Sequence, residues 1–241
     1  RDSVGFVVSD TFSLAALAQT RSYRAVAYDT LDAVMTGIAF AWASSNPSVA
    51  TVTADGVVQP HANGVAEIRA TLSGKTVTAK ATVAGHEIEP RVSFRNQIQS
   101  VFTKYGCNSG GCHGKASGQN GFRLSLLGFD TAFDYNAVVK EARGRRVFPA
   151  SPESSLLILK AIGAVPHGGG KKVQPGSTEY ELLVRWVRQG APAGTKDDPA
   201  VAKIDVFPKS RVVGRMADQQ LLVTATYTDG TVRDVTREAQ Y

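Results

Sequence analysis

CNSGGCHG, residues 107–114, holds both cysteines of the chain and one of its four histidines. Two thiols followed directly by an imidazole are what covalent attachment of haem c requires, because the sulfurs bond the vinyl groups and the adjacent histidine binds the iron. The usual motif has two residues between the cysteines, whereas four separate Cys107 from Cys112 here. Residues 109–111 can bulge outward, since glycine tolerates the dihedral angles that this requires. The stretch therefore predicts a haem domain in the centre of the chain.

Three other interpretations of the cysteines remain open. A disulfide between Cys107 and Cys112 would close a small ring in an oxidising compartment. A zinc site would combine both thiolates with His113 and a further ligand such as His167. Inert buried thiols are the third interpretation, which a Gly-rich turn that also contains Ser and Asn disfavours.

Two predicted helices enclose the cysteine stretch. Apolar residues recur at helical spacing over residues 94–105, and Ser93 is available as the N-cap. Thr178 begins a predicted capping box, which precedes an apolar stripe over residues 182–187. A helix that leads into the attachment site and a second that packs across it are the layout of small single-haem cytochromes c. We therefore predict a mainly α, class-I-like cytochrome c domain.

His113 is the predicted proximal ligand of the iron, and the ligand on the opposite face has to come from elsewhere. Neither methionine of the chain, Met35 or Met216, lies in the segment 91–192. Without the thioether that raises the potential of Met/His centres, a haem site in this segment is expected to have a low potential.

The loop VPHGGGKK, residues 165–172, supplies the candidate for the opposite face. Its proline and its three glycines suit a loop that passes close to a flat macrocycle and carries one side chain over it. We expect His167 to be the distal ligand. An open or water-bound sixth position is the alternative, with Lys171 and Tyr105 as further candidate ligands.

The charge of the chain favours no nucleic-acid partner, although the net charge is +6 and the pI about 9.4. Its densest basic cluster, Arg143, Arg145 and Arg146, has no nearby aromatic platform of the kind that stacks bases. Because arginine pairs well with carboxylates, these three side chains are candidates for contacts with the haem propionates. A solvated basic face, or a docking patch for an acidic redox partner, is the alternative.

The flanking segments have a different pattern from the centre. Between residues 23 and 83, short alternating apolar runs are broken by turn signals at Asp55-Gly56 and Ser73-Gly74, which is typical of a β-sandwich. In the tail, residues 221–230 echo residues 24–29. The echo includes no counterpart of the later strands, so we expect a partial second sandwich and a natural protein that continues.

Two resemblances extend this interpretation. Residues 42–52 (WASSNPSVATV), 55–58 and 64–68 resemble bacterial group-2 immunoglobulin-like domains, a family of spacer or adhesive modules to which the resemblance assigns no catalysis. Residues 91–192 resemble planctomycete-type cytochrome c domains. The residues that carry this second resemblance are 107–114, 121–126, 148–157, 166–170 and 183–192.

The cytochrome resemblance implies one covalent haem c, bonded through Cys107 and Cys112 with His113 on the iron. Many relatives have a methionine-proline pair where this chain has Pro166-His167. The distal ligand is therefore the position at which this chain departs from the family pattern, as it also does in the spacing of its cysteines.

The predicted chain is multidomain. It comprises an all-β immunoglobulin-like sandwich over residues 1–86, the cytochrome c-like haem domain over 91–192, a linker over 193–202, and the N-terminal part of a second immunoglobulin-like domain over 203–241. No apolar run approaches the ~20 residues that a membrane span needs. Residues 1–3 carry charge at once, so no secretory signal is recognised at the start.

We expect an extracytoplasmic bacterial electron-transfer module, in the periplasm or at the cell surface, because bacteria attach haem c outside the cytoplasm. Its expected partners are a redox protein and further domains of a longer protein. Two alternatives stay open: a scaffold or adhesion protein that binds carbohydrate or protein, and a haem site with an open sixth position that acts on peroxide or a small gas. An electron carrier is favoured over an enzyme.

Overall fold

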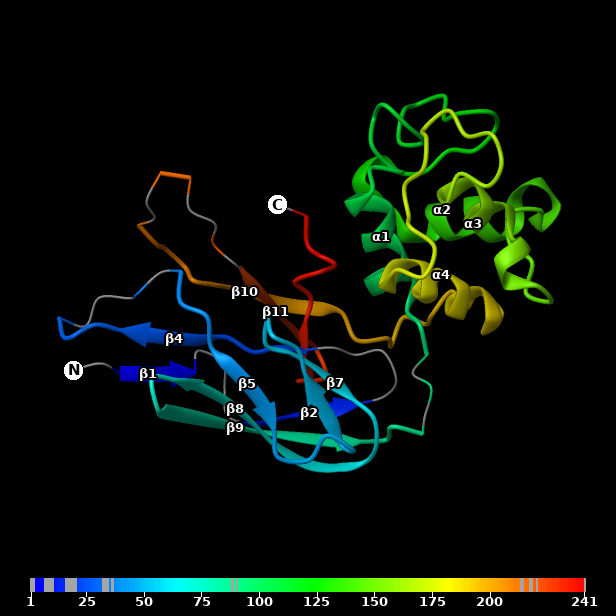
Figure 1. Ribbon diagram of the computed structural model, residues 1–241. Coiled ribbons are helices and arrows are strands. Elements are labelled where there is room, and N and C mark those ends of the chain that lie inside the picture. Colours follow the sequence, from blue (N-terminus) through cyan, green and yellow to red (C-terminus); the bar gives the residue numbers. More distant parts are fainter. Residues whose placement is uncertain are drawn as a thin grey trace. The chain divides into compact units, whose positions relative to one another are not determined.

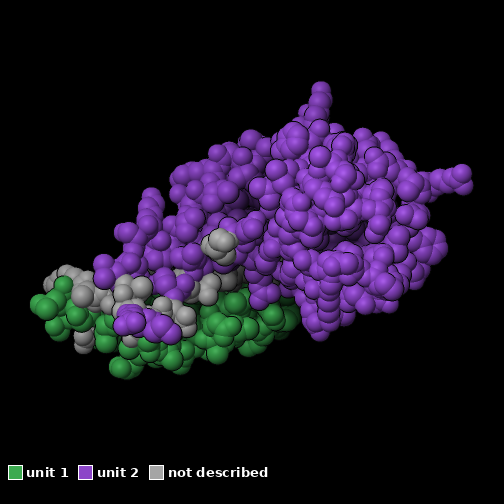
Figure 2. Space-filling view, turned by 90° about the horizontal axis from the view of Figure 1, so that it is seen from above, with its two compact units in different colours: residues 1–90 green, residues 91–241 purple. Residues whose placement is uncertain are grey.

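The structure is a computed structural model that describes residues 3–6, 11–15, 21–31, 35, 37–87, 89, 91–212, 215–216, 219 and 221–240. Two compact units divide the chain, Arg1–Pro90 and Arg91–Tyr241 (Figure 2). The first consists of strands, and the second combines short helices with a small sheet.

Unit 1 is an all-β structure whose strands lie in layered sheets (Figure 1). Its largest sheet has the order β2-β9-β8-β5, a second has the order β3-β7-β6, and β1 pairs with β4. The pairs are antiparallel except for β2 and β9, which run parallel. The strands are β1 (Ser3–Phe6), β2 (Thr11–Ala15), β3 (Arg21–Ser22), β4 (Ala25–Tyr28), β5 (Ala41–Ser44), β6 (Ala50–Val52), β7 (Val57–Pro60), β8 (Gly64–Leu72) and β9 (Lys75–Ala84).

Alternation of side chains places the core of unit 1. Ala66, Ile68 and Ala70 of β8 are buried while the residues between them are exposed, as the period of two along a strand requires. At the predicted turn before β7, Gly56 has a φ of 80°, and a Cβ there would lie 2.9 Å from the Trp42 ring. Only glycine fits this position. The predicted immunoglobulin-like sandwich at the N-terminus is confirmed.

In unit 2, residues 91–192 fold into short helices. Ser93 caps the first of them as predicted, with its side chain accepting a hydrogen bond from the Asn96 amide, although the first turn is π-helical. The cap of the last helix is Ser177 and not Thr178, which is the first helical residue. The segments are η1 (Phe94–Ile98, π), α1 (Gln99–Lys104), η2 (Leu126–Gly128, 3₁₀), α2 (Thr131–Tyr135), η3 (Asn136–Lys140, π), η4 (Glu141–Gly144, 3₁₀), η5 (Pro152–Ser154, 3₁₀), α3 (Leu156–Ala161) and α4 (Thr178–Arg188).

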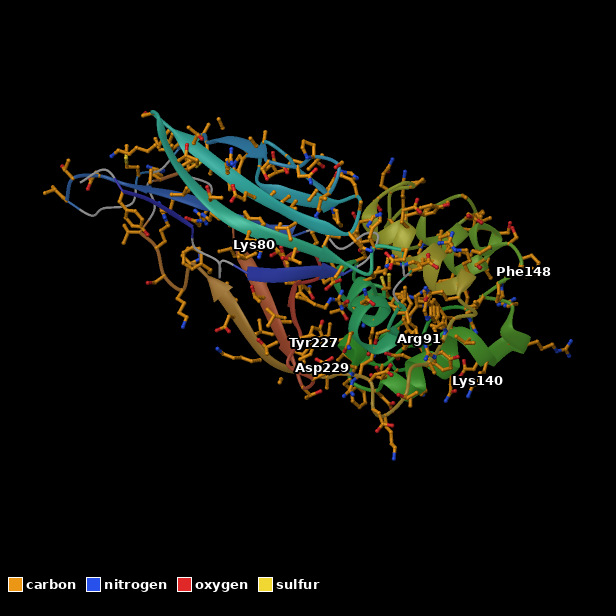
Figure 3. The ribbon with its side chains drawn as sticks, turned by 90° about the horizontal axis from the view of Figure 1, so that it is seen from below. Lys80, Arg91, Lys140, Phe148, Tyr227 and Asp229 are labelled. Carbon is orange, nitrogen blue, oxygen red and sulfur yellow. The ribbon has the colours of Figure 1, made fainter. Side chains whose placement is uncertain are left out.

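Aromatic rings join the two ends of this helical part. Phe94 of η1 is fully buried, with ring-centroid distances of 5.4 Å to Trp186 of α4 and 5.3 Å to Tyr135. The Trp186 indole N–H donates to the Pro192 carbonyl at 3.0 Å, so the buried ring leaves no unmet donor. The first and last helices thus share one core, whereas Lys140 and Phe148 lie on the outside (Figure 3).

The remainder of unit 2 is an antiparallel sheet of order β10-β11-β12. Its strands are β10 (Val201–Phe207), β11 (Leu222–Tyr227) and β12 (Val232–Asp234), and Figure 3 marks the turn between the last two at Asp229. Strand β10 begins inside the range expected for the linker. Residues that flank the sheet contact the helical part: Asn96 Nδ2 donates to the Pro199 carbonyl at 2.7 Å, and Lys104 Nζ donates to the Arg237 carbonyl.

Candidate cofactor site

The stretch 107–114 forms a compact loop closed by its own backbone. The His113 amide donates to the Cys107 carbonyl at 2.9 Å, and the Cys112 amide donates to the Ser109 carbonyl at 3.0 Å. Asn108 is fully buried, and its side-chain amide donates to Thr103 Oγ1 at 2.9 Å. Residues 110–111 are exposed. The extra residues of the widened spacing therefore project outward, which leaves both thiols on the inner side.

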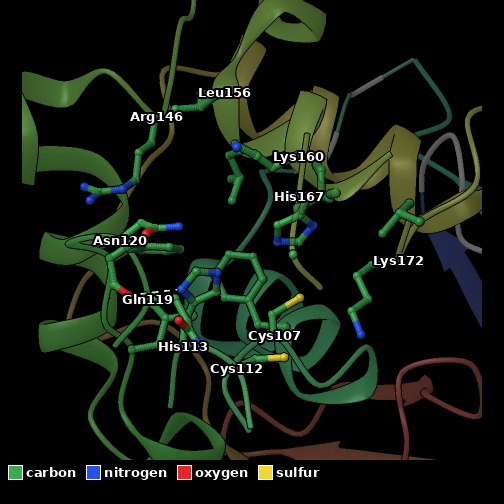
Figure 4. Close-up of a pocket in the computed structure, with 18 of the residues that line it drawn as sticks. Cys107, Cys112, His113, Gln119, Asn120, Arg146, Leu156, Lys160, His167 and Lys172 are labelled. Carbon is green, nitrogen blue, oxygen red and sulfur yellow. Dashed lines mark hydrogen bonds between the residues drawn. The ribbon is translucent and has the colours of Figure 1, made fainter. Parts of the chain in front are cut away.

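Both thiols open into a cavity of about 320 Å³, a size at which pockets hold small ligands. Cys107, Cys112 and His113 reach it from the loop, and His167 faces His113 from the loop after α3 (Figure 4). Burial raises the pKa of the Cys107 thiol to about 11, so the free thiol is neutral. Apolar side chains make up much of the remaining wall, chiefly Val101, Phe102, Phe122, Leu124, Leu156, Leu157, Val173 and Leu183.

The two imidazoles lie near each other in the cavity with nearly parallel rings. Their ring centroids are 6.3 Å apart and their planes differ by 8°. A metal–imidazole bond is about 2 Å long. A five-membered ring with sides of about 1.33 Å has its centre about 1.1 Å from each atom. Two such bonds in line thus put the ring centres about 6.2 Å apart, which is close to the observed centroid distance.

Backbone carbonyls orient both rings. A carbonyl can only accept, so His113 Nδ1 donates to the Phe122 carbonyl at 3.0 Å and His167 Nδ1 donates to the Gly170 carbonyl at 2.9 Å. In each ring the Nε2 lone pair is left for a metal, the arrangement that ligating histidines commonly show. Burial lowers the pKa of His113, which keeps its ring neutral and able to coordinate.

The charged residues that line the cavity are all cations: Arg145, Arg146, Lys160 and Lys172. No carboxylate lines it in the part of the chain that the structure describes, so the cavity suits a ligand with an apolar body and anionic groups. Sequence reasoning singled out neither lysine, although Lys172 is the last residue of the loop 165–172 that carries His167. Lys160 lies on α3 and carried no local signal.

Arg146 is 4% exposed and donates to the carbonyls of Ala137 at 2.8 Å, Gly121 at 2.9 Å and Glu141 at 3.3 Å. Its guanidinium lies 4.5 Å from the Phe122 ring centroid, and burial lowers its pKa. It therefore holds the backbone that orients His113, and two of its five N–H groups remain for a propionate.

The other candidates of the sequence analysis lie differently. Arg143, Tyr105 and Lys171 do not line the cavity, whereas Arg145 does. Cys107 and Cys112 are free thiols, so the structure contains no disulfide between them. Among the described residues, no group of three or more His, Cys, Asp or Glu side chains is placed to hold a metal ion. The zinc alternative therefore lacks its ligand set there.

A family model matches most of the first unit. Residues 7–84 match the bacterial Ig-like domain (group 2) family. This match agrees with the layered strands of unit 1 and with the Trp42–Gly56 contact at its core. It does not extend to the helical part.

The chain is also similar to solved structures of an S-layer protein. Domains 4 and 5 of the S-layer protein SbsC share 20% identity with a TM-score of 0.31, over 34% of this chain and 51% of that one. Domains 5–6 of the same protein share 20% identity and a TM-score of 0.31, over 38% and 47%. The chain thus spans about half the length of these structures, and a likeness this weak assigns no role. No curated protein matches the chain.

Helices in the described residues are short, and none has the length and apolar character needed to cross a bilayer.

Proposed function

We propose that residues 91–192 bind one covalent haem c and serve as a one-electron carrier. Cys107 and Cys112 would form the thioethers, and His113 and His167 would hold the iron. The single observation that carries the proposal is the pair of facing imidazoles, parallel to within 8° and 6.3 Å apart, beside two free thiols in one cavity.

The residues that line the cavity have separate roles in the proposed haem binding. When bound, haem c supplies a one-electron iron couple, whose potential is low where a second imidazole takes the place of a thioether. Phe122 and Gly170 orient the two rings through their carbonyls. Phe102, Leu124 and Leu183 line the cavity and would exclude water from the iron. The four cations oppose the charge of the propionates.

Intact mass and a pyridine haemochrome spectrum test the proposal most directly. The chain has to be produced in a bacterial host that exports it and attaches haem c. We expect a protein heavier than its sequence by one haem, with a low-spin six-coordinate spectrum. A polypeptide of unmodified mass without Soret absorption would exclude the proposal, and a high-spin spectrum would favour an open site for peroxide or a small gas.

We infer a second role for unit 1, as a spacer or adhesive module outside the cytoplasm. The family match over residues 7–84 supports it. Cell fractionation with surface labelling tests the location. Recovery of the intact protein from the cytoplasm alone would contradict both this role and covalent haem attachment.

A further inference from the structure

The loop from Leu126 to Phe129 presents large apolar side chains to solvent. Leu126 is 50% exposed, Leu127 59% and Phe129 84%. We call these three residues the apolar ledge. It lies directly against the loop 107–114, because the Leu127 amide donates to the Asn108 carbonyl at 3.1 Å and Leu126 Cδ1 lies 4.0 Å from where a Cβ on Gly110 would be.

Buried polar groups fix the ledge in place. Asp134 is fully buried and accepts from the Ser125 amide at 2.5 Å, from Ser125 Oγ at 2.8 Å and from Gln99 Nε2 at 2.8 Å. Gln99 Nε2 also donates to the Gly128 carbonyl at 2.8 Å. The network therefore holds the loop by hydrogen bonds at Ser125 and at Gly128, on both sides of Leu127. A buried network whose polar groups are all paired makes its surroundings rigid.

The backbone of the ledge is strained. Leu127 has a φ of 54°, in the left-handed region that residues with a branched side chain rarely adopt. Folding alone gives no reason to hold a leucine in this conformation with its side chain in water. Strain that a rigid surrounding maintains, together with a cluster of exposed apolar side chains, is typical of an interaction site.

The charge of the chain indicates what kind of partner fits. Residues 91–192 contain 14 Lys and Arg against 6 Asp and Glu, a net charge of +8, whereas the whole chain has +6. Residues 1–90 and 193–241 have net charges of −2 and 0, so the positive charge belongs to the helical part. Arg123, an exposed cation of this part, stacks over the Phe133 ring at 4.7 Å. A domain with a net positive charge and an exposed apolar cluster complements an acidic partner.

We propose that the apolar ledge is the docking surface for an acidic redox protein whose contact face has an apolar centre. The inference rests on the proposed function, since it places electron exchange at the outer side of the attachment loop. The apolar side chains supply the affinity, and the positive charge of residues 91–192 speeds the encounter.

The test compares Leu127→Asn/Phe129→Gln with the wild-type holoprotein. Asparagine tolerates the left-handed conformation, so the backbone of the ledge is preserved. Reduced flavodoxin, a small acidic one-electron carrier, is the probe. Calorimetric titration gives its Kd, and stopped-flow absorbance gives its second-order rate of electron transfer. We expect the double variant to raise the Kd and lower the rate about tenfold, a change of about 1.4 kcal/mol. We also expect added salt to raise the Kd and lower the rate, because it screens the attraction between the charged surfaces.

Ile204→Thr is the matched control, because Ile204 on β10 is 58% exposed and lies outside the helical part. Dithionite, a small reductant, should reduce all three proteins at one rate. Phe129→Gln alone repeats the test should the double variant fold poorly. Equal Kd values and rates for the double variant and the control would overturn the proposal.

Two results would overturn the proposal in favour of another partner. If the double variant loses binding to anionic vesicles while its Kd and rate with flavodoxin stay unchanged, the ledge binds a membrane surface. If the double variant changes its oligomeric state, the ledge binds a second copy of the chain. Absence of haem would be seen in the mass and spectrum and would count against the proposed function. The calorimetric Kd would still report on the ledge in that case.

Discussion

Replacing Gly114 by alanine should disrupt the cysteine loop. A Cβ on Gly114 would lie 2.0 Å from the Asn108 carbonyl oxygen and 2.9 Å from that of Ser109, whereas ordinary contact begins at 3.4 Å. The neighbouring backbone would have to move by about 1.4 Å, the difference between 3.4 and 2.0 Å. Backbone cannot rotate away as a flexible side chain can, so the loop itself must open.

The size of the effect follows from what that movement breaks. The Gly114 amide donates to the Ser109 carbonyl at 3.0 Å, and the displaced Asn108 carbonyl accepts from the Leu127 amide at 3.1 Å. Overpacking of a closed site costs about 1–3 kcal/mol, and each lost hydrogen bond about 0.5–1.5 kcal/mol. We expect Gly114→Ala to lower the free energy of unfolding of unit 2 by about 3 kcal/mol.

Gly111→Ala is a control within the same loop. Gly111 is exposed, and a Cβ there would meet nothing within 4 Å. Its replacement should change stability by less than about 0.5 kcal/mol. Neither glycine has a positive φ, so the two variants differ in space and not in backbone conformation.

Urea unfolding followed by tryptophan fluorescence measures the difference, because Trp186 is fully buried in the core of unit 2. With a slope of about 1–3 kcal/mol per molar urea, the midpoint should fall by 1 M or more for Gly114→Ala. The ratio of Soret absorbance to protein should fall with it. Equal midpoints for the two variants would refute the close approach at Gly114.

Three further predictions concern the cavity and the sheet. His167→Ala should convert a low-spin absorption spectrum to a high-spin one, whereas His61→Ala in unit 1 should not; an unchanged spectrum removes His167 as a ligand. Cys107→Ala should leave one thioether and shift the pyridine haemochrome band, and a band identical to that of the wild type would show that Cys107 is not attached. Burial raises the pKa of Glu238 from its ordinary 4.5, against the opposing charge of Arg233, so the folded state holds the proton more tightly than the unfolded state. The free energy of unfolding should therefore fall as pH rises from about 4.5 through the raised pKa, and Glu238→Gln should flatten this fall in urea titrations. Glu153→Gln, at an exposed position, is the control, and a pH dependence equal in both variants would contradict the assignment.

The strands of unit 1 were predictable from sequence because alternate residues face a core. The Asp55-Gly56 turn was predictable because the backbone there needs a positive φ. Periodicity also located the helix pair. It could not distinguish Ser177 from Thr178 as the cap, since both hydroxyls accept equally well and tertiary packing decides where the helix begins.

The basic cluster shows where sequence reasoning ends. Arg143, Arg145 and Arg146 look alike in the sequence, yet positive φ angles at Ala142 and Arg143 turn the chain so that only Arg146 is buried. Its carbonyl partners come from segments up to 25 residues away. Local pattern contains no information on such contacts, and the same holds for Lys160 at the cavity wall.

The carbonyls of Phe122 and Gly170 have a consequence for kinetics. Both imidazoles are already aligned by the protein before any ligand binds, and each is tied to backbone instead of water. If haem binds as proposed, a centre whose ligands barely move when its charge changes would have a small reorganisation energy. Electron self-exchange between an oxidised and a reduced copy should then be fast. Loss of the hydrogen bond between either ring and its carbonyl should slow it.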